Sequence, residues 1–134
     1  MTDLTASAGL VRGLFDFAVM RGADRHLLAA RASIDERALE DADNRIAFDV
    51  YIALMREATV LCGDPALALH YGESVDLSEV SIVGLIMNAS ETMAEAFAQL
   101  QRFSQLALEV EGVGERFGVT VRDDGLWIVD QRTN

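Results

Sequence analysis

The sequence contains no lysine, and its charge is strongly one-sided. All of its 11 basic residues are arginine, they are set against 22 acidic residues, and the formal net charge is −11. Proteins attract nucleic acid through clustered cations that displace counterions from the phosphates, whereas the field of this chain repels phosphate. An anionic membrane surface is disfavoured for the same reason. We therefore expect this chain to contact neither nucleic acid nor a membrane directly.

Cysteine and long apolar runs are also scarce. The single cysteine, Cys62, excludes an internal disulfide and gives no indication of a secreted, disulfide-rich scaffold. The first residues show no basic leader followed by an apolar stretch, and no apolar run approaches the ~20 residues that cross a bilayer. These observations predict a soluble protein of the reducing cytoplasm.

The hydrophobic content, 51% of 134 residues, is enough for one domain with one core. The spacing of apolar residues changes once along the chain, from a helical period to a period of two. We predict an α+β fold in a single domain, residues 1–134, with a mainly helical part over 8–105. A C-terminal antiparallel β-hairpin or small sheet follows over 106–132.

The N-terminal helices have recognisable starts and stops. The first predicted helix ends at Arg21-Gly22, where glycine can adopt a left-handed cap. Asp24 and Asp35 are placed to cap the next two short helices. The apolar face of the first helix consists of Val11, Leu14, Phe15 and Ala18.

The middle of the chain has the clearest helical pattern. An apolar stripe runs to Gly63, and Asp64 as N-cap with Pro65 at the first position then predicts a helix to about Ser74. The stripe consists of Phe48, Tyr51, Ile52, Met55, Ala58 and Cys62. This arrangement is a corner between two helices, and because no basic recognition helix follows, it does not indicate DNA binding.

Two further helices are predicted before the sheet. The segment 80–90 is apolar nearly all round, which indicates a buried helix in which Gly84 allows a close backbone approach. Thr92 and Glu95 form a capping-box pattern that starts a long amphipathic helix. The residues expected to face inward from that helix are Met93, Ala96, Phe97, Leu100 and Phe103.

The C-terminal strands alternate apolar and polar residues and are joined by Asp123-Asp124-Gly125. A three-residue loop would place Val121 opposite Trp127 and Val119 opposite Val129, whereas a two-residue Asp124-Gly125 turn would place Val119 opposite Asp130. We prefer the three-residue loop. An isolated hairpin is marginal in water, so this one needs a third strand, a helix beneath it or the sheet edge of another chain.

The sequence offers little material for catalysis. The reactive candidates are Cys62, His26 and His70, and neither a nucleophile–base pair nor a metal-ligand spacing is present. Core packing explains Cys62, and solvent contact explains His26. The glycines of 112–118 lack the lysine and the helix of a phosphate loop. We predict no catalytic residue, no metal, no cofactor and no enzyme activity.

The aromatic and methionine content leaves two interpretations open. Such a stripe usually forms core, because helices bury one face, but it can also line a cavity for a small, largely apolar molecule. His70 beside Tyr71 could donate a hydrogen bond to such a ligand. The candidate ligand-binding residues are Tyr51, Met55, His70, Met87, Phe97, Phe103 and Trp127.

An ordered series of segments resembles the N-terminal effector-binding domain of AraC-family transcriptional regulators, in the branch labelled arabinose-binding-like. The series consists of 44-NRIAFDVYIALMREA-58, 63-GDPALALHYGE-73 and 82-IVGLIMNASETMAEAFAQLQRF-103. Its matching features are Arg45-Ile46, Tyr51, Gly63-Asp64-Pro65, Gly72-Glu73, Gly84, Ser90, Thr92 and Phe103. Three positions depart from the pattern: Ala47 and Glu91 stand where proline is usual, and Ser81 where glycine is expected.

The resemblance implies a sensing function. A small effector, which we expect to be apolar or amphipathic, would shift the domain between states, and the shift would pass to DNA-binding modules or through a homodimer interface. The resemblance also implies that the Gly-Asp-Pro corner is a structural joint. The helix-turn-helix DNA-binding domain of the family is not found in this sequence, so we expect a truncated form or a short relative. The alternative is a ligand-free homo-oligomerisation domain.

Overall fold

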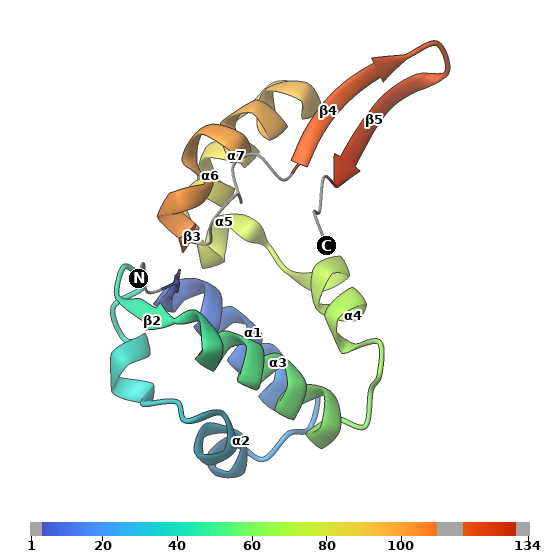
Figure 1. Cartoon of the computed structure of the whole chain (residues 1–134). Helices are drawn as coiled ribbons and strands as arrows, with labels where there is room; N and C mark the ends of the chain where they lie inside the picture. The colour runs from blue at the N-terminus through green and yellow to red at the C-terminus, as the bar shows by residue number, and fades with distance from the viewer. Residues whose placement is uncertain (1–3, 110–116, 131–134) are drawn as a thin grey trace.

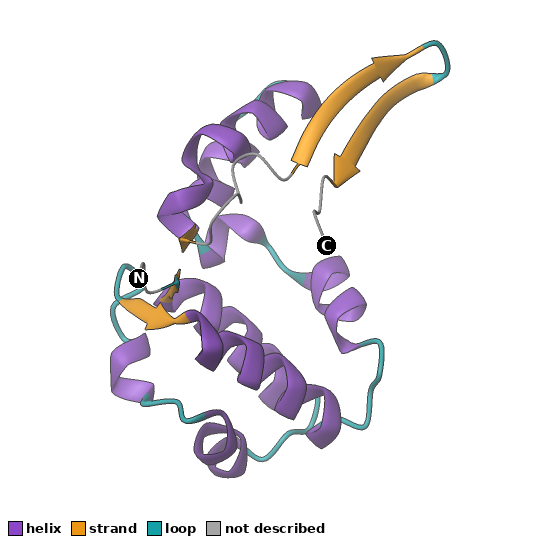
Figure 2. Cartoon of the chain, in the orientation of Figure 1, coloured by secondary structure: helices purple, strands orange, loops and turns teal. Residues whose placement is uncertain are grey.

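The computed structural model describes residues 4–109 and 117–130. Helices make up most of the chain and a hairpin lies at its C-terminal end, so the α+β prediction is confirmed (Figures 1 and 2). In chain order, the elements of the N-terminal half are β1 Thr5–Ser7, α1 Ala8–Met20, α2 Arg25–Ala32, the 3-10 helix η1 Glu36–Leu39, β2 Arg45–Ala47 and α3 Phe48–Leu61. Those of the C-terminal half are α4 Leu67–Ser74, α5 Leu77–Val80, α6 Ile82–Asn88, α7 Met93–Ala107, β3 Leu108–Glu109, β4 Phe117–Arg122 and β5 Gly125–Asp130.

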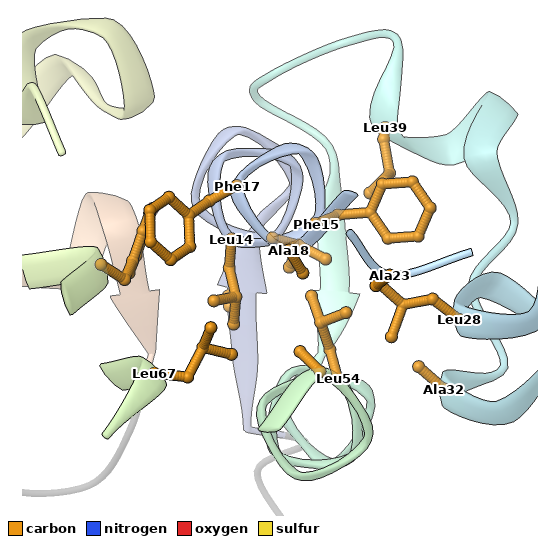
Figure 3. Close-up of a cluster of buried hydrophobic side chains, with 14 of the residues drawn as sticks. Leu14, Phe15, Phe17, Ala18, Ala23, Leu28, Ala32, Leu39, Leu54 and Leu67 are labelled. Atoms are coloured by element: carbon orange, nitrogen blue, oxygen red, sulfur yellow. The ribbon is translucent and has the colours of Figure 1, made fainter. Parts of the chain in front are cut away.

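The core forms around α1, which packs beside α3 with α2 on one side and α4 on the other (Figures 1 and 3). The four residues predicted on the inward face of α1 are all fully buried. Phe15 extends toward Leu39 of η1, and Leu54 of α3 lies opposite α1 in the close-up (Figure 3). Burying a side chain of this size contributes about 1.5–3 kcal/mol, so this cluster is the main stabilising unit.

The predicted helix starts agree with the structure for α2, η1 and α7. The Asp24 carboxylate accepts from Leu27 N at 2.8 Å, and the Asp35 carboxylate accepts from Arg37 N at 3.0 Å. The capping box is formed as predicted: Thr92 Oγ1 accepts from Glu95 N at 3.2 Å, and Glu95 Oε2 accepts from Thr92 N at 3.3 Å.

Some apolar faces differ from their prediction. On α3 the buried residues are Leu54 and Ala58, so the face is rotated away from Ile52, which is exposed. The segment 80–90 is not one fully buried helix: Val80 ends α5, and α6 begins after Ser81 and runs from Ile82 to Asn88. Gly84 is buried there as expected. The outer face of α6 is in solvent, because nothing among the described residues covers it. The exposed apolar residues on α6 and at the start of α7 are Ile82, Leu85 and Met93.

A small sheet that the sequence did not reveal joins the two halves of the helical part. Its strand order is β2-β1-β3, and both pairings are antiparallel. The Arg45 guanidinium fastens it, because Nε donates to Thr5 Oγ1 at 3.0 Å and Nη1 donates to the Leu106 carbonyl at 2.9 Å. β3 directly follows α7, so Leu106 belongs to a helix and not to a strand. The part of the β prediction that covers 110–116 and 131–132 lies outside the described residues.

The hairpin register differs from the one we preferred. Asp123 and Asp124 form a two-residue turn, Arg122 pairs with Gly125, and Thr120 pairs with Trp127. A shift of one residue reverses the face of a strand, so Trp127 lies on the face opposite to that of Val121. The indole Nε1 donates to Asp124 Oδ1 at 2.9 Å, and the Arg122 guanidinium carbon lies 5.0 Å from the ring centroid. These polar and cation–π contacts hold the side chain in this register.

Candidate functional site

A groove of about 400 Å³ lies between α1, α4 and α5. Its walls come from two stretches that are far apart in sequence and adjacent in the fold, because α1 packs against α5 and Phe17 packs against Tyr71. The α1 wall consists of Gly9, Arg12, Gly13, Asp16, Phe17 and Met20. The opposite wall consists of Tyr71, Ser74, Val75, Asp76, Glu79 and Val80. The groove is thus a mixed site, with apolar side chains among charged ones.

Two glycines allow α1 to approach the opposite wall closely. A Cβ atom at Gly9 would lie 2.6 Å from the Val80 carbonyl oxygen, and one at Gly13 would lie 2.7 Å from the Tyr71 hydroxyl. A Cβ atom does not tolerate such distances. These positions therefore need glycine because of neighbouring atoms, and the close approach shapes the floor of the groove.

The Tyr71 hydroxyl is the polar atom at that floor. Tyr71 is 9% exposed, its ring centroid lies 5.2 Å from that of Phe17, and its hydroxyl has no hydrogen-bond partner among the described residues. Burial raises the pKa of this phenol, so the group stays protonated and can donate a hydrogen bond. A buried hydroxyl without a hydrogen-bond partner lowers the stability of the fold. A ligand that accepts a hydrogen bond from it would remove this cost.

The Gly-Asp-Pro corner is built around the Asp64 carboxylate. Asp64 Oδ2 accepts from Arg21 at the end of α1, at 3.1 Å, and lies 2.6 Å from His70 Nδ1 on α4. Its other oxygen accepts from Ala66 N at 3.0 Å. The helix begins at Leu67, two residues later than predicted, so Asp64 caps the preceding turn instead of the helix itself. The hydrogen bond from His70 is the main cause that lowers the pKa of this carboxyl.

The residues predicted to bind a ligand do not gather in this groove. Tyr51 and Met55 are half-buried against the main core, and burial raises the pKa of the Tyr51 phenol. His70 joins the Asp64 corner. Met87 lies on α6, Phe97 and Phe103 lie half-buried on α7, and Trp127 lies on β5. The described residues include no group of three or more metal-ligating side chains.

Sequence reasoning missed Tyr71 itself, although it named the neighbouring His70. A signal for it was present: Tyr71 follows Leu67 by four residues, on the buried face of one helix. A tyrosine on such a face buries its ring and leaves a hydroxyl in need of a partner. The glycines that form the α1 wall gave no comparable signal, because only the packed structure shows what each one faces.

The hairpin carries a second candidate surface. Its observed register places Val119 opposite Ile128 and Val121 opposite Leu126, so these four side chains share one face, which we call the hairpin apolar face. Val121 is 80% exposed, and both Leu126 and Ile128 are also exposed. The hairpin begins beside α7 and points away from the helical core (Figure 1). Clustered exposed apolar side chains of this kind usually mark a contact surface.

Among the described residues, no helix is long and apolar enough to cross a membrane. In a comparison with protein families, the model of the arabinose-binding domain of AraC transcription regulators, N-terminal, matches residues 22–134. The groove wall on α1 lies before the matched residues.

A curated relative is the ornithine utilization regulator of Pseudomonas aeruginosa. Over 101 residues this chain is 31% identical to it, which covers 73% of this chain and 30% of the relative. The chain therefore matches less than a third of the length of that protein. No solved structure matches the chain.

Proposed function

Because the chain belongs to the family of N-terminal arabinose-binding domains of AraC transcription regulators, we propose that it binds a small-molecule effector in the groove between α1, α4 and α5. The observation that carries this proposal is the Tyr71 hydroxyl, which has no partner among the described residues and is buried at the floor of a groove large enough for a small metabolite. A bound effector would pair with that hydroxyl and favour one arrangement of α1 against α5.

The proposed output is transcriptional regulation. The groove lies between α1, which belongs to the main core, and α5, which leads to α6 and α7. A bound effector would therefore change how α1 packs against α5. In a regulator, such a change reaches DNA through separate DNA-binding modules in the cytoplasm, because this acidic chain does not attract DNA itself. The relative's name ties that protein to ornithine use, and an amino acid is therefore included among the compounds to be tested.

Thermal unfolding with a metabolite panel tests this proposal. The panel contains amino acids, amines, sugars and carboxylic acids, and a compound that binds only the folded state at about 100 times its Kd adds about 2.7 kcal/mol of stability. Ser74→Trp places an indole at the groove and is expected to abolish the rise in Tm. Leu69→Trp places the same side chain on an exposed part of α4 outside the groove and serves as the matched control.

Two results would contradict the proposal. One is a panel in which no compound raises the Tm of the unchanged chain. The other is a compound whose effect survives in Ser74→Trp, because that compound would bind elsewhere.

We also propose that two copies of the chain associate through the hairpin apolar face. Its four apolar side chains lie next to one another on a two-stranded sheet whose outward edges have no partner among the described residues. A second hairpin offers the same surface, so a two-fold contact would bury both faces at once. Size exclusion with light scattering measures the mass in solution, and a monomer at all concentrations would refute this part of the proposal.

A further inference from the structure

The groove that we propose as the effector site carries an excess of negative charge. Three carboxylates line it, from Asp16, Asp76 and Glu79, against the single guanidinium of Arg12. Arg12 Nη1 donates to the Leu39 carbonyl at 3.3 Å, on the η1 side of α1. Within the described part of the chain, the groove therefore presents more anionic than cationic groups to anything that enters it.

The three carboxylates differ in the hydrogen bonds and ion pairs that already stabilise their negative charge. Asp16 is exposed and lies 3.7 Å from Arg25, a loose pair. Asp76 Oδ1 accepts from Ser78 N at 2.9 Å and from the Ser78 hydroxyl; these bonds lower the pKa of the carboxyl and keep it charged. The Glu79 side chain has no hydrogen bond or ion pair with another described residue. Glu79 is thus the charge on the groove wall that a cation could pair with.

The Tyr71 hydroxyl lies in the same groove and gives a second, independent reason to expect a ligand there. It is buried and lies against Gly13. Among the described residues, neither this hydroxyl nor the Glu79 carboxylate on the same wall has a partner. Between these polar groups the lining is apolar, from Phe17, Val75 and Val80. A molecule that satisfies all of these groups has a cationic head, an apolar stem and a hydrogen-bonding atom.

From this arrangement we infer that the groove binds a small amphipathic organic cation, with an ammonium or guanidinium head at Glu79 and an apolar stem along Phe17 and Val80. This inference rests on the proposed function, since it names the chemical class of the effector. The contacts come from Phe17 on α1, Tyr71 on α4 and Glu79 on α5, so the ligand would connect α1 to the segment that leads to α6. Charge-assisted hydrogen bonds of this kind give direction as well as affinity.

Three probes with stems of equal length differ only in the charge of the head: n-hexylammonium, n-hexanol and hexanoate. Binding is measured on the full chain by calorimetry and by the rise in Tm. We expect n-hexylammonium to bind and to raise the Tm, with n-hexanol much weaker and hexanoate repelled. Equal or stronger binding of n-hexanol or hexanoate would overturn the assignment to cations while leaving a groove site in place.

Two variants test the contacts. Glu79→Gln is expected to weaken n-hexylammonium about tenfold, because the head loses its counter-charge. Its control is Glu73→Gln, which removes the same charge from an exposed site outside the groove. The Tyr71 hydroxyl is tested with 6-hydroxyhexylammonium, which adds a hydrogen-bond acceptor to the same stem. Tyr71→Phe is expected to weaken this probe about fivefold. The Tm of the free chain should stay equal or rise, because the variant removes a buried hydroxyl that has no partner among the described residues.

The outcomes distinguish this inference from the proposed function. Equal losses in Glu79→Gln and Glu73→Gln would mean that net charge alone attracts the probe, and the inference would fail. It would also fail if n-hexylammonium did not bind, or if Tyr71→Phe bound 6-hydroxyhexylammonium as well as the unchanged chain does. In each of these cases the effector function stands as long as some other compound of the metabolite panel binds in a manner that Ser74→Trp abolishes.

Discussion

At the scale of single residues, Asp64 shows how a family signature can be structural. The sequence singled out the Gly-Asp-Pro corner, and the structure explains the need for an acid there: one carboxylate holds Arg21 of the α1 end and His70 of α4. The corner therefore fixes α4, and with it Tyr71, relative to α1. The same helix supplies part of one groove wall, through Tyr71 and Ser74, so Asp64 supports the candidate site without lining it.

This role predicts a pH-dependent stability for the corner. In the folded state the pKa of Asp64 is lowered, so its stabilisation is fully present above its ordinary pKa, which is about 4, and is lost as the pH falls through the folded value. We expect Asp64→Asn to unfold at a lower temperature than the unchanged chain at pH 7, with a gap that closes below pH 4. Circular dichroism melts across this range measure the gap.

Asp43→Asn is the matched control, because Asp43 is exposed and its carboxylate has no bond among the described residues. It should melt like the unchanged chain at every pH. A gap for Asp64→Asn that is constant from pH 7 to pH 3 would show that its charge is not what stabilises the corner.

At the scale of elements, the junction of α5 and α6 depends on a glycine. A Cβ atom at Gly84 would overlap the backbone carbonyl of Leu77, and backbone cannot move aside as a side chain can. We expect Gly84→Ala to lower the free energy of unfolding by about 2 kcal/mol, as for other overpacked sites. Urea denaturation with an unchanged m-value measures this loss.

Gly72 provides the opposite case on α4. A Cβ atom there would meet nothing within 4 Å, so Gly72→Ala should stabilise the chain by about 0.5 kcal/mol through lower unfolded-state entropy. If both alanine variants changed stability equally, helix propensity and not the Leu77 contact would govern Gly84.

The same scale shows which elements a sequence can specify. Helix starts were predictable where one polar side chain bonds a nearby N–H, as at Asp24 and Thr92, because that interaction is local. The strands β1 and β2 were not predictable, since three residues give no alternation and their pairing depends on distant partners. The hairpin register failed for another reason: residues 126–129 are all apolar, so a period of two fits either face.

The candidate site was less predictable than the fold. The groove joins residues of α1 to residues about sixty positions later, and its shape depends on what each glycine faces. The aromatic and methionine residues that composition singled out are spread over the core, α6, α7 and the hairpin. Which of these residues come into contact depends on how the helices pack. A periodic pattern in the sequence predicts only which face of its own helix or strand each residue occupies.

At the scale of the whole molecule, two proposals respond to salt in opposite directions. The chain carries a net charge of −11, so bringing two copies together costs electrostatic work that dissolved ions reduce. The hairpin apolar face itself carries no charged side chain and gains nothing from low salt. An organic cation in the acidic groove, in contrast, is attracted by the same charge and loses affinity as salt screens it.

We therefore expect dimerisation to tighten between about 10 mM and about 150 mM NaCl, over which the Debye length falls from about 30 Å to about 8 Å. Light scattering across a dilution series gives the dissociation constant at each salt concentration. Val121→Glu places a charge on the hairpin apolar face and should leave a monomer, while Thr120→Glu places it on the opposite face of the same strand and should still dimerise. Dimers that weaken with salt, or that Thr120→Glu disrupts equally, would mean that ion pairs or the Trp127 face hold the two copies together.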